Sequence, residues 1–199
     1  GIRCGKSRWA EQHLRVLGGP VTYITPGYPA DPDADPEWAA RVAAHRLARP
    51  ASWATVETVD VAAAVRAEPG PVLVDCVGTW LTRQLDAVGW DTPRPVVTSE
   101  LERRIADLAS AVAEHPGPIV LVTNEVGWGV VSEHASGRLF ADLLGRANQA
   151  LGAVCDDVVL LVAGRALHLQ GRARAQRIAR PSSRPSVISS TTAPRTSPV

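Results

Sequence analysis

The 199-residue sequence contains no methionine, one phenylalanine, two tyrosines and only three cysteines. It has no run of roughly 20 apolar residues, which a membrane-spanning helix needs, and it starts in a glycine-containing turn instead of a charged and then apolar leader. Cys4, Cys76 and Cys155 form no C-x-x-C pair and are odd in number, which argues against a zinc site and a disulfide framework. We therefore expect a cytoplasmic protein with reduced thiols and no membrane span.

Acidic residues are absent from one end of the chain. The net charge is +1, but residues 171–199 contain six arginines and no acid, which leaves 15 basic and 20 acidic residues in 1–170, a net charge of −5. We expect one folded domain over residues 1–169 and a basic, Ser/Pro/Arg-rich disordered tail over 170–199. A basic tail can bind RNA, so a nucleotide-sensing or RNA-binding module is one alternative. The acidic balance of residues 1–170 argues against it, and we expect no specific nucleic-acid partner.

Short apolar runs alternate with stretches of helical periodicity, which is typical of βα units that build a parallel sheet. The runs lack polar alternation, as expected of strands buried on both faces. Asp35 can cap a helix with Pro36 at its first position, and Ser99 with Glu102 fits a capping box. We predict strands at Val21–Thr25, Val72–Cys76, Ile119–Thr123 and Val158–Val162, helices at Lys6–Leu17, Pro36–Ala48, Val59–Ala67, Trp80–Ala87, Ser99–Glu114 and Arg138–Leu151, and surface loops at Gly27–Asp35 and Gly89–Pro95.

The first seven residues, Gly1-Ile2-Arg3-Cys4-Gly5-Lys6-Ser7, match the end of the phosphate-binding loop G-x-x-x-x-G-K-[ST]. In that motif backbone N–H groups hold the phosphates, the lysine reaches the β- and γ-phosphates, and the hydroxyl holds Mg²⁺. Lys6 and Ser7 take these roles. The first motif glycine would fall one position before Gly1, and the strand that precedes such a loop is absent, so we expect an upstream segment to be missing.

A carboxylate follows the most apolar predicted strand, in Val72-Leu73-Val74-Asp75. Nucleotide sites in open α/β sheets lie at the carboxyl ends of the strands, and an acid at that edge can hold the Mg²⁺ of a bound nucleotide. A helix cap or turn acid is the structural alternative. The presence of Lys6-Ser7 favours the metal role for Asp75.

His45 lies among cations. On a helix Arg41, His45 and Arg49 share one face, and such a cluster is costly without an anion, which a polyphosphate would supply. Cationic neighbours also favour the neutral, nucleophilic imidazole. A lone helical histidine is nonetheless more often a surface or structural residue. Downstream, Trp53 and Glu57 could provide a stacking surface and a hydrogen-bond acceptor for a base, although each alone more often packs or is solvated.

In order and spacing, these segments resemble one family, the bifunctional adenosylcobinamide kinase / adenosylcobinamide-phosphate guanylyltransferases of cobalamin biosynthesis. The resemblance runs from Gly1 to about Leu169. It rests on an ordered set of segments: Gly1–Glu11, Thr22–Thr25, Arg41–Pro50 with Trp53 and Glu57, Leu73–Cys76, Trp80–Thr82, Val122–Gly129, Arg138–Phe140 and Gly145–Gln149.

The resemblance implies a P-loop NTPase fold of RecA-like type, an α/β fold with a mostly parallel sheet flanked by helices, whose first strand is missing from this chain. It also implies two reactions. ATP or GTP phosphorylates the aminopropanol arm of adenosylcobinamide. GTP then forms a GMP-histidine with release of pyrophosphate, and adenosylcobinamide phosphate takes the GMP to give adenosylcobinamide-GDP. A homo-oligomer is implied as well. A P-loop kinase of another small molecule, without the transferase step, is the remaining alternative.

Carried over residue by residue, the resemblance makes His45 the guanylylated histidine and Lys6 the second catalytic residue. It assigns Mg²⁺ to Ser7 and Asp75. It assigns nucleotide binding to Gly1, Ile2, Arg3, Cys4, Gly5, Lys6, Ser7, Thr25, Pro26, Gly27, Arg46, Leu47, Ala48, Arg49, Glu57 and Asp75.

Other positions stay open or depart from the family pattern. Asn124-Glu125 follows a predicted strand, so it is either a sheet-edge turn or a contact to nucleotide or corrinoid. Cys4 stands where the family usually has serine, which a loop that binds through backbone N–H groups should tolerate. The Gly27–Asp35 loop is longer and richer in proline than is usual, and Arg83 occupies a position often held by asparagine.

Overall fold

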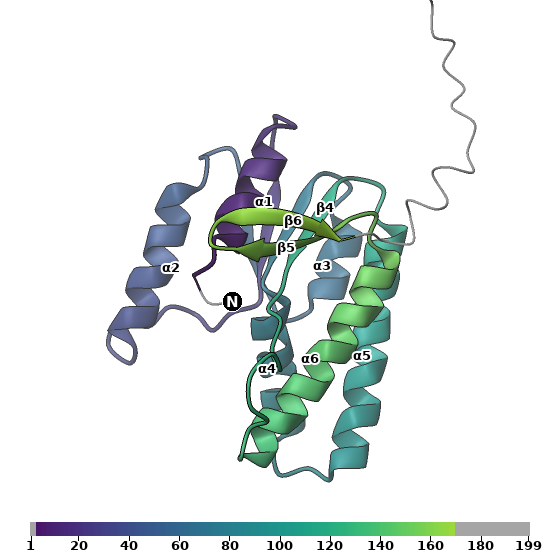
Figure 1. Cartoon of the computed structure of the whole chain (residues 1–199). Coiled ribbons are helices and arrows are strands. Elements are labelled where there is room, and N and C mark those ends of the chain that lie inside the picture. Colours follow the sequence, from purple (N-terminus) through teal and green to yellow (C-terminus); the bar gives the residue numbers. More distant parts are fainter. Residues whose placement is uncertain (1–2, 170–199) are drawn as a thin grey trace, which may run out of the picture.

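The computed structural model of the chain describes residues 3–169 (Figure 1). Its elements in chain order are α1 (Lys6–Arg15), β1 (Thr22–Thr25), α2 (Pro36–Ala48), β2 (Ala54–Glu57), α3 (Val61–Ala67), β3 (Val72–Asp75), α4 (Val77–Val88), α5 (Arg94–Glu114), β4 (Ile119–Val122), α6 (Ala135–Val154), β5 (Val158–Val162) and β6 (Arg165–Leu169). None of the helices in this part of the chain is long and apolar enough to cross a membrane.

Four strands form a parallel sheet in the order β2-β1-β3-β4. Thr22–Ile24 of β1 pair with Val72–Val74 of β3, and the whole of β3 pairs with β4. The carboxyl ends of β1 and β3 therefore meet at one edge of the sheet. The predicted parallel α/β fold is confirmed by this arrangement.

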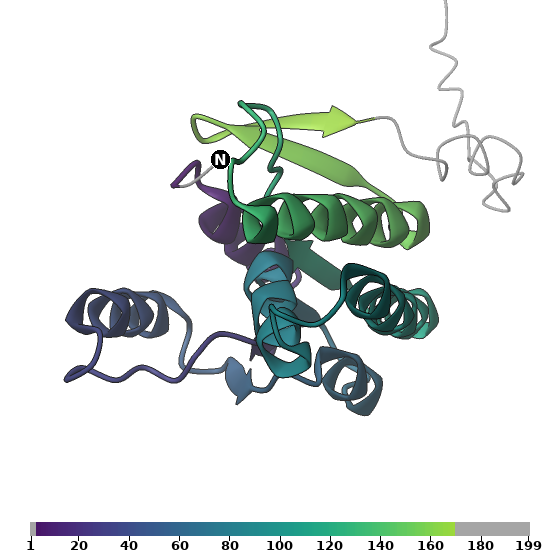
Figure 2. The same cartoon turned by 90° about the horizontal axis from the view of Figure 1, so that it is seen from below.

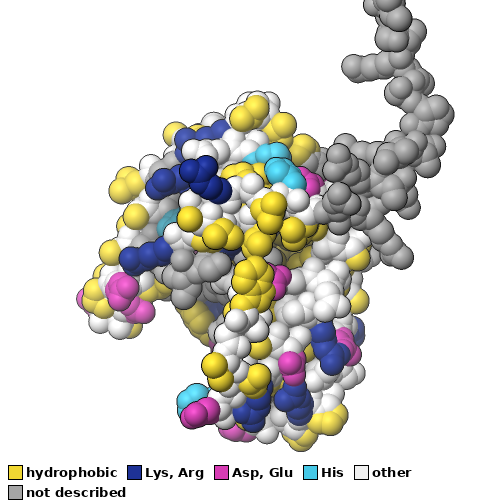
Figure 3. Space-filling view, viewed as in Figure 1, with side chains coloured by type: hydrophobic (Ala, Val, Ile, Leu, Met, Phe, Trp, Pro, Cys, Tyr) yellow, Lys and Arg dark blue, Asp and Glu magenta, His cyan; other side chains and the backbone are white. Residues whose placement is uncertain are grey.

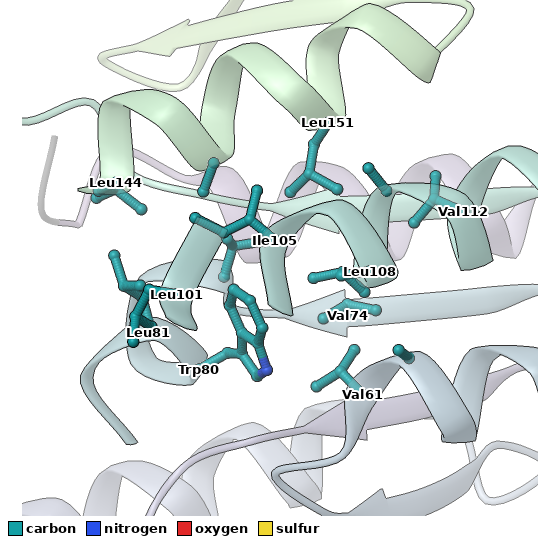
Figure 4. Close-up of a cluster of buried hydrophobic side chains, with 14 of the residues drawn as sticks. Val61, Val74, Trp80, Leu81, Leu101, Ile105, Leu108, Val112, Leu144 and Leu151 are labelled. Atoms are coloured by element: carbon teal, nitrogen blue, oxygen red, sulfur yellow. The ribbon is translucent and has the colours of Figure 1, made fainter. Parts of the chain in front are cut away.

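The two faces of the sheet are covered by different helices, because successive side chains of a strand point to opposite faces. Ile24, Val72 and Val74 pack with α3, α4, α5 and α6 in the larger apolar cluster, part of which Figure 4 shows. Tyr23 and Leu73 pack on the other face with α1. Full burial of one large apolar side chain contributes about 1.5–3 kcal/mol, so both clusters fix the sheet edge at which β1 and β3 end.

Helix α2 stands outside this arrangement. In Figure 2 it is the dark blue helix set apart from the others, and none of its described side chains is buried. Its bounds, Pro36–Ala48, are those predicted. The predicted cap is also confirmed, because the Asp35 carboxylate accepts a hydrogen bond from the Trp38 N–H at 2.9 Å.

Two predictions about secondary structure are wrong. The capping box at Ser99 does not form, because α5 already begins at Arg94 after Pro93, and its buried face includes Val97 and Leu101. Val158–Val162 is a strand, but it does not join the parallel sheet. It pairs antiparallel with β6 in a separate hairpin.

The structure has two strands, β2 and β6, that the sequence analysis does not predict. Most of β2 and all of β6 are exposed, so neither shows the apolar run that marks a buried strand. The hairpin of β5 and β6 turns at Ala163 and Gly164, which both have positive φ, as a two-residue hairpin turn requires. The other predicted elements are present with ends shifted by a few residues.

A cavity of about 570 Å³ separates β4 from β5 and reaches α1; Leu14, Ile119, Leu121 and Leu161 contribute to its lining. Within residues 3–169, β4 pairs along one edge only, with β3. The predicted upstream strand and the predicted tail over 170–199 lie outside the described residues and stay predictions.

Candidate active site

The predicted phosphate-binding loop ends at a helix N-terminus, as the sequence pattern indicates. Gly5 caps α1 with φ of 97°, a left-handed conformation that glycine adopts without strain. The Cys4 carbonyl accepts a hydrogen bond from the Gly164 N–H at 3.0 Å, so the turn of the β5–β6 hairpin holds the loop from outside the sheet. Lys6 and Ser7 are the first two residues of α1, where the positive end of the helix dipole favours an anion.

Asp75 is the last residue of β3 and lies at the carboxyl edge of the sheet. The Tyr23 hydroxyl, from β1, donates a hydrogen bond of 2.7 Å to the Asp75 Oδ2. Burial, followed by the nearby Asp75 carboxylate, raises the pKa of Tyr23 well above its ordinary value. The hydroxyl therefore stays protonated and keeps the Asp75 carboxylate in one orientation.

The cationic end of α2 is joined to the sheet through polar and ring contacts. The Arg49 guanidinium lies 3.4 Å from the centroid of the Tyr23 ring, and its Nη1 donates to Thr55 Oγ1 at 3.1 Å. The Arg49 Nε is buried and has no hydrogen-bond partner among the described residues. Arg46, one turn before, forms an ion pair with Glu57 at the end of β2.

These three parts open onto one cavity of about 310 Å³. Its lining includes ten of the predicted site residues: Arg3, Lys6, Ser7, Thr25, Gly27, His45, Arg46, Arg49, Glu57 and Asp75. Lys6 and His45 thus face the same space, although they come from different helices. On the face shown in Figure 3, Lys and Arg side chains lie over the part formed by α1, α2 and the β5–β6 hairpin, with acidic side chains at one end of α2, and the part formed by α4, α5 and α6 also carries both signs.

Other predicted residues do not line the cavity. Cys4, Gly5 and Pro26 belong to the neighbouring backbone segments, and Leu47 is 87% exposed on the outer side of α2. Trp53 is buried in the cluster around α1 and Tyr23 and is absent from the lining, so its packing interpretation is the one that holds. Gly1, Ile2 and the side chains of Arg41 and Ala48 lie outside the described part of the chain.

The segment after β4 is the sheet-edge turn of the two interpretations of Asn124-Glu125, and the contact to nucleotide or corrinoid stays a prediction. Asn148, on α6, accepts a hydrogen bond from Thr123 Oγ1 at 2.7 Å and donates to the Asn124 carbonyl and to Glu125 Oε1, both at 3.0 Å. The turn is therefore held by its backbone and by Glu125. The Asn124 side chain remains at the cavity wall.

Several residues around the cavity are not among the predicted site residues. Tyr23 orients Asp75, and Thr79 lines the cavity from the first turn of α4. Glu11 is buried on α1; burial raises its pKa against the opposing effect of the nearby His45. Arg83 donates to the Gly27 carbonyl at 2.9 Å and lies 4.3 Å from the centroid of the Tyr28 ring. A polar residue one turn into the helix after Asp75 is the sequence signal that could have identified Thr79.

The donor set fits Mg²⁺ bound together with a nucleotide. Residues 3–169 contain no group of three or more His, Cys, Asp or Glu side chains able to hold a metal by themselves. Mg²⁺ at phosphate sites needs only one or two protein oxygens, because phosphates and water complete its shell. Ser7 and Asp75 offer a hydroxyl and a carboxylate to the same cavity.

A glycine-capped helix that begins with Lys-Ser, beside an acid at the carboxyl edge of a parallel sheet, defines a nucleotide-binding protein of the P-loop NTPase type. The sequence pattern of the family described as cobinamide kinase / cobinamide phosphate guanyltransferase matches residues 1–169, and the chain belongs to this family. The predicted family resemblance is thereby confirmed.

Three relatives have the same kind of name. The bifunctional adenosylcobalamin biosynthesis protein CobU of Salmonella typhimurium (strain LT2) is 38% identical over 175 residues, which cover 82% of this chain and 93% of the relative. The protein CobP of Pseudomonas aeruginosa (strain PAO1) is 37% identical, with 86% and 94% covered. CobU of Escherichia coli (strain K12) is 37% identical, with 82% and 93% covered.

Proposed function

We propose that this chain performs both reactions of its family, the phosphorylation of adenosylcobinamide and the guanylylation of the resulting phosphate, in the one cavity that Lys6 and His45 share. The observation that supports this proposal is that shared cavity, which is lined both by the N-terminal end of α1 and by His45 on the cationic helix α2. A small-molecule kinase without a transferase step would not need the part of the cavity that His45 lines.

In the kinase reaction the chain binds and orients the nucleotide. The first turn of α1 and the Lys6 ammonium hold the β- and γ-phosphates of ATP or GTP, and Ser7 and Asp75 would hold Mg²⁺, which neutralises phosphate charge when bound. The aminopropanol hydroxyl oxygen attacks the γ-phosphorus, the bond to the β–γ bridging oxygen breaks, and the nucleoside diphosphate leaves. One proton is released overall.

In the guanylyltransferase reaction His45 is the nucleophile. Its neutral ring nitrogen attacks the α-phosphorus of GTP, the bond to the α–β bridging oxygen breaks, and pyrophosphate leaves. A phosphate oxygen of adenosylcobinamide phosphate then attacks the same phosphorus, the P–N bond breaks, and neutral His45 is regenerated beside adenosylcobinamide-GDP. The covalent intermediate divides one difficult displacement into two easier ones. Arg46 and Arg49 line the cavity near His45 and provide positive charge for the phosphates.

The test is covalent labelling with GTP that carries the label on the α-phosphate. We expect an acid-labile, base-stable GMP adduct that maps to His45 and is lost in His45→Asn. His134→Asn, at an exposed histidine before α6, is the matched control and should label normally. An adduct that persists in His45→Asn, or no adduct on a chain that binds GTP, would contradict the proposal.

The same proposal includes the location of the enzyme. Because its nucleotide substrates are ATP and GTP, we place it in the cytoplasm.

We also propose a homo-oligomer, supported by the exposed apolar residues Val126, Trp128, Val130 and Val131. Figure 3 shows hydrophobic side chains where the loop between β4 and α6 crosses this face. Light scattering should report a mass above that of one chain, and Val130→Asp with Val131→Asp should reduce it.

A further inference from the structure

A second hollow, of about 600 Å³, adjoins the nucleotide cavity. The Gly27–Asp35 loop, the start of α2 and the first half of α4 form most of it, and Phe140 of α6 also contributes to the lining. We call it the loop groove. It shares Tyr28, Trp38, Thr79 and Asn124 with the nucleotide cavity. A molecule seated in the loop groove would therefore reach the nucleotide across a common wall.

The charge of the loop groove is opposite to that of the nucleotide cavity. Four of the cavity-lining residues are the cations Arg3, Lys6, Arg46 and Arg49. The lining of the loop groove includes no Lys or Arg, but it includes the carboxylates of Asp31 and Asp35. A second polyphosphate would be repelled there, whereas a neutral or cationic ligand would not.

Both carboxylates are held in place by backbone hydrogen bonds. Asp31 Oδ1 accepts from the N–H groups of Asp33 and Ala34 at 2.9 and 3.1 Å, and Asp35 caps α2. The two carboxylates therefore keep fixed positions in the loop.

The apolar part of the loop groove is aromatic and includes Tyr28, Trp38 and Phe140. Tyr28 is fixed by three contacts: its ring lies under the Arg83 guanidinium, its hydroxyl donates to Asp86, and its carbonyl accepts from Trp38 Nε1 at 3.1 Å. The groove is thus built before any ligand arrives. Preorganised aromatic walls with a few polar groups are typical of small-molecule sites.

We propose that the loop groove binds the corrinoid ring of cobinamide and directs its aminopropanol arm past Thr79 and Asn124 into the nucleotide cavity. This inference rests on the proposed function. The substrate is a broad, largely apolar macrocycle edged with amides and carrying a positive cobalt centre, which matches aromatic walls, the hydroxyl and amide groups of Thr82 and Asn124, and the two carboxylates. The same seated corrinoid then serves both reactions, because Lys6 and His45 face the cavity at the end of the arm.

The test uses substitutions that fill the loop groove and leave the nucleotide cavity alone. Ala34→Trp and Thr82→Trp lie in different elements, and both positions line the groove without lining the cavity. We expect the KM for cobinamide in the kinase assay to rise about tenfold or more, with kcat changed much less. The affinity for cobinamide, measured by titration of its absorption spectrum, should fall by the same factor. GMP-adduct formation from GTP alone should stay within about twofold of the parent chain. Ala87→Trp, at an exposed alanine of α4 outside the groove, is the matched control and should change nothing.

A gentler variant guards against misfolding. Asp31→Asn with Asp35→Asn removes both charges while an asparagine oxygen can still accept the same backbone hydrogen bonds. We expect the KM for cobinamide to rise about threefold relative to the parent chain. This difference should become smaller at high salt, which screens the charges.

The outcomes separate the two proposals. If the parent chain forms no GMP adduct, the proposed function fails. If it forms the adduct but all three groove variants keep the parental KM for cobinamide, only the corrinoid assignment is overturned. A loss of adduct formation that parallels the loss of cobinamide binding would also overturn it, because the groove would then belong to the nucleotide site.

Discussion

Helices α1 and α2 both bring functional groups to the nucleotide cavity, but the fold holds them differently. Ala10, Glu11 and Leu14 of α1 are buried against the sheet. Among the described side chains of α2 none is buried, and its C-terminal end is held by the ion pair of Arg46 with Glu57 and by the contacts of Arg49. The half of the cavity formed by α1 is therefore fixed by core packing, whereas the half with His45 depends on a few contacts of Arg46 and Arg49.

This difference suits the two reactions. Phosphoryl transfer is mainly positioning and charge neutralisation, which a rigid helix end and the sheet-bound Asp75 provide. Nucleotidyl transfer requires His45 to meet an α-phosphate and then to present the GMP to a second substrate. The Arg46–Glu57 pair is exposed, and exposed ion pairs contribute only about 0–1 kcal/mol each, so α2 can adjust at less cost than a helix held by core packing.

The largest expected effect comes from the fixed half. Asp75→Asn keeps an acceptor for the Tyr23 hydroxyl but removes the carboxylate that would hold Mg²⁺, so phosphate transfer to cobinamide should fall on the order of 1,000-fold. Transfer of a γ-phosphate label measures it. Asp91→Asn, in an exposed loop, is the control. A loss of less than about tenfold would argue against Asp75 as a metal ligand.

The next effect is on stability and compares the same substitution in both helices. Leu14 is 1% exposed and Leu47 is 87% exposed. Leu14→Ala should lower the free energy of unfolding by about 2–5 kcal/mol through lost packing and a cavity, and Leu47→Ala by less than about 0.5 kcal/mol. Urea unfolding measures both. Equal losses would show that α2 is packed as firmly as α1.

Hydrogen exchange examines the same contrast in the unmodified chain. Backbone amides of α2 should exchange at least about tenfold faster than those of α1, since local opening costs less where few apolar contacts break. Mass spectrometry of the peptic peptides resolves the two helices. GTP should slow exchange in α2, and equal protection of both helices without nucleotide would contradict the comparison.

The smallest effect concerns the exposed pair at the end of α2. Arg46→Ala should change the free energy of unfolding by no more than about 1 kcal/mol but raise the KM for GTP in adduct formation about threefold, because a cation is lost from the cavity wall. Thermal unfolding and the labelling assay report the two quantities. Arg94→Ala removes a comparable exposed ion pair with Asp142. Neither residue lines the cavity, so the KM for GTP should stay unchanged.

The parts predicted well are those whose information is local. The helix that begins at Lys6-Ser7, the position of Asp75 at the end of a buried strand, and the cap at Asp35 with Pro36 each depend on residues adjacent in sequence. The phosphate and metal roles of these residues stay predictions. The parts missed depend on tertiary contacts. The exposed strands β2 and β6 form because they pair with β1 and β5. The capping box at Ser99 does not form because burial of Val97 and Leu101 stabilises a helix that begins before it.

The site shows the same division. Sequence alone does not place Tyr23 against Asp75 or under Arg49, because those contacts join three separate elements. The Arg83 contact to the long Gly27–Asp35 loop has the same origin. Trp53 shows the reverse case: an aromatic residue beside a candidate site that packs in the core instead.

The claim at the centre of the account is that Lys6 and His45 act on nucleotide in the same cavity. The most direct test measures the rate of GMP-histidine formation from GTP at increasing concentrations of a non-hydrolysable ATP analogue. We expect competitive inhibition, with full rate restored by excess GTP, and a matching loss of adduct formation in Lys6→Ala. Adduct formation that is indifferent to the analogue and to Lys6→Ala would place the two residues in separate sites and contradict the claim.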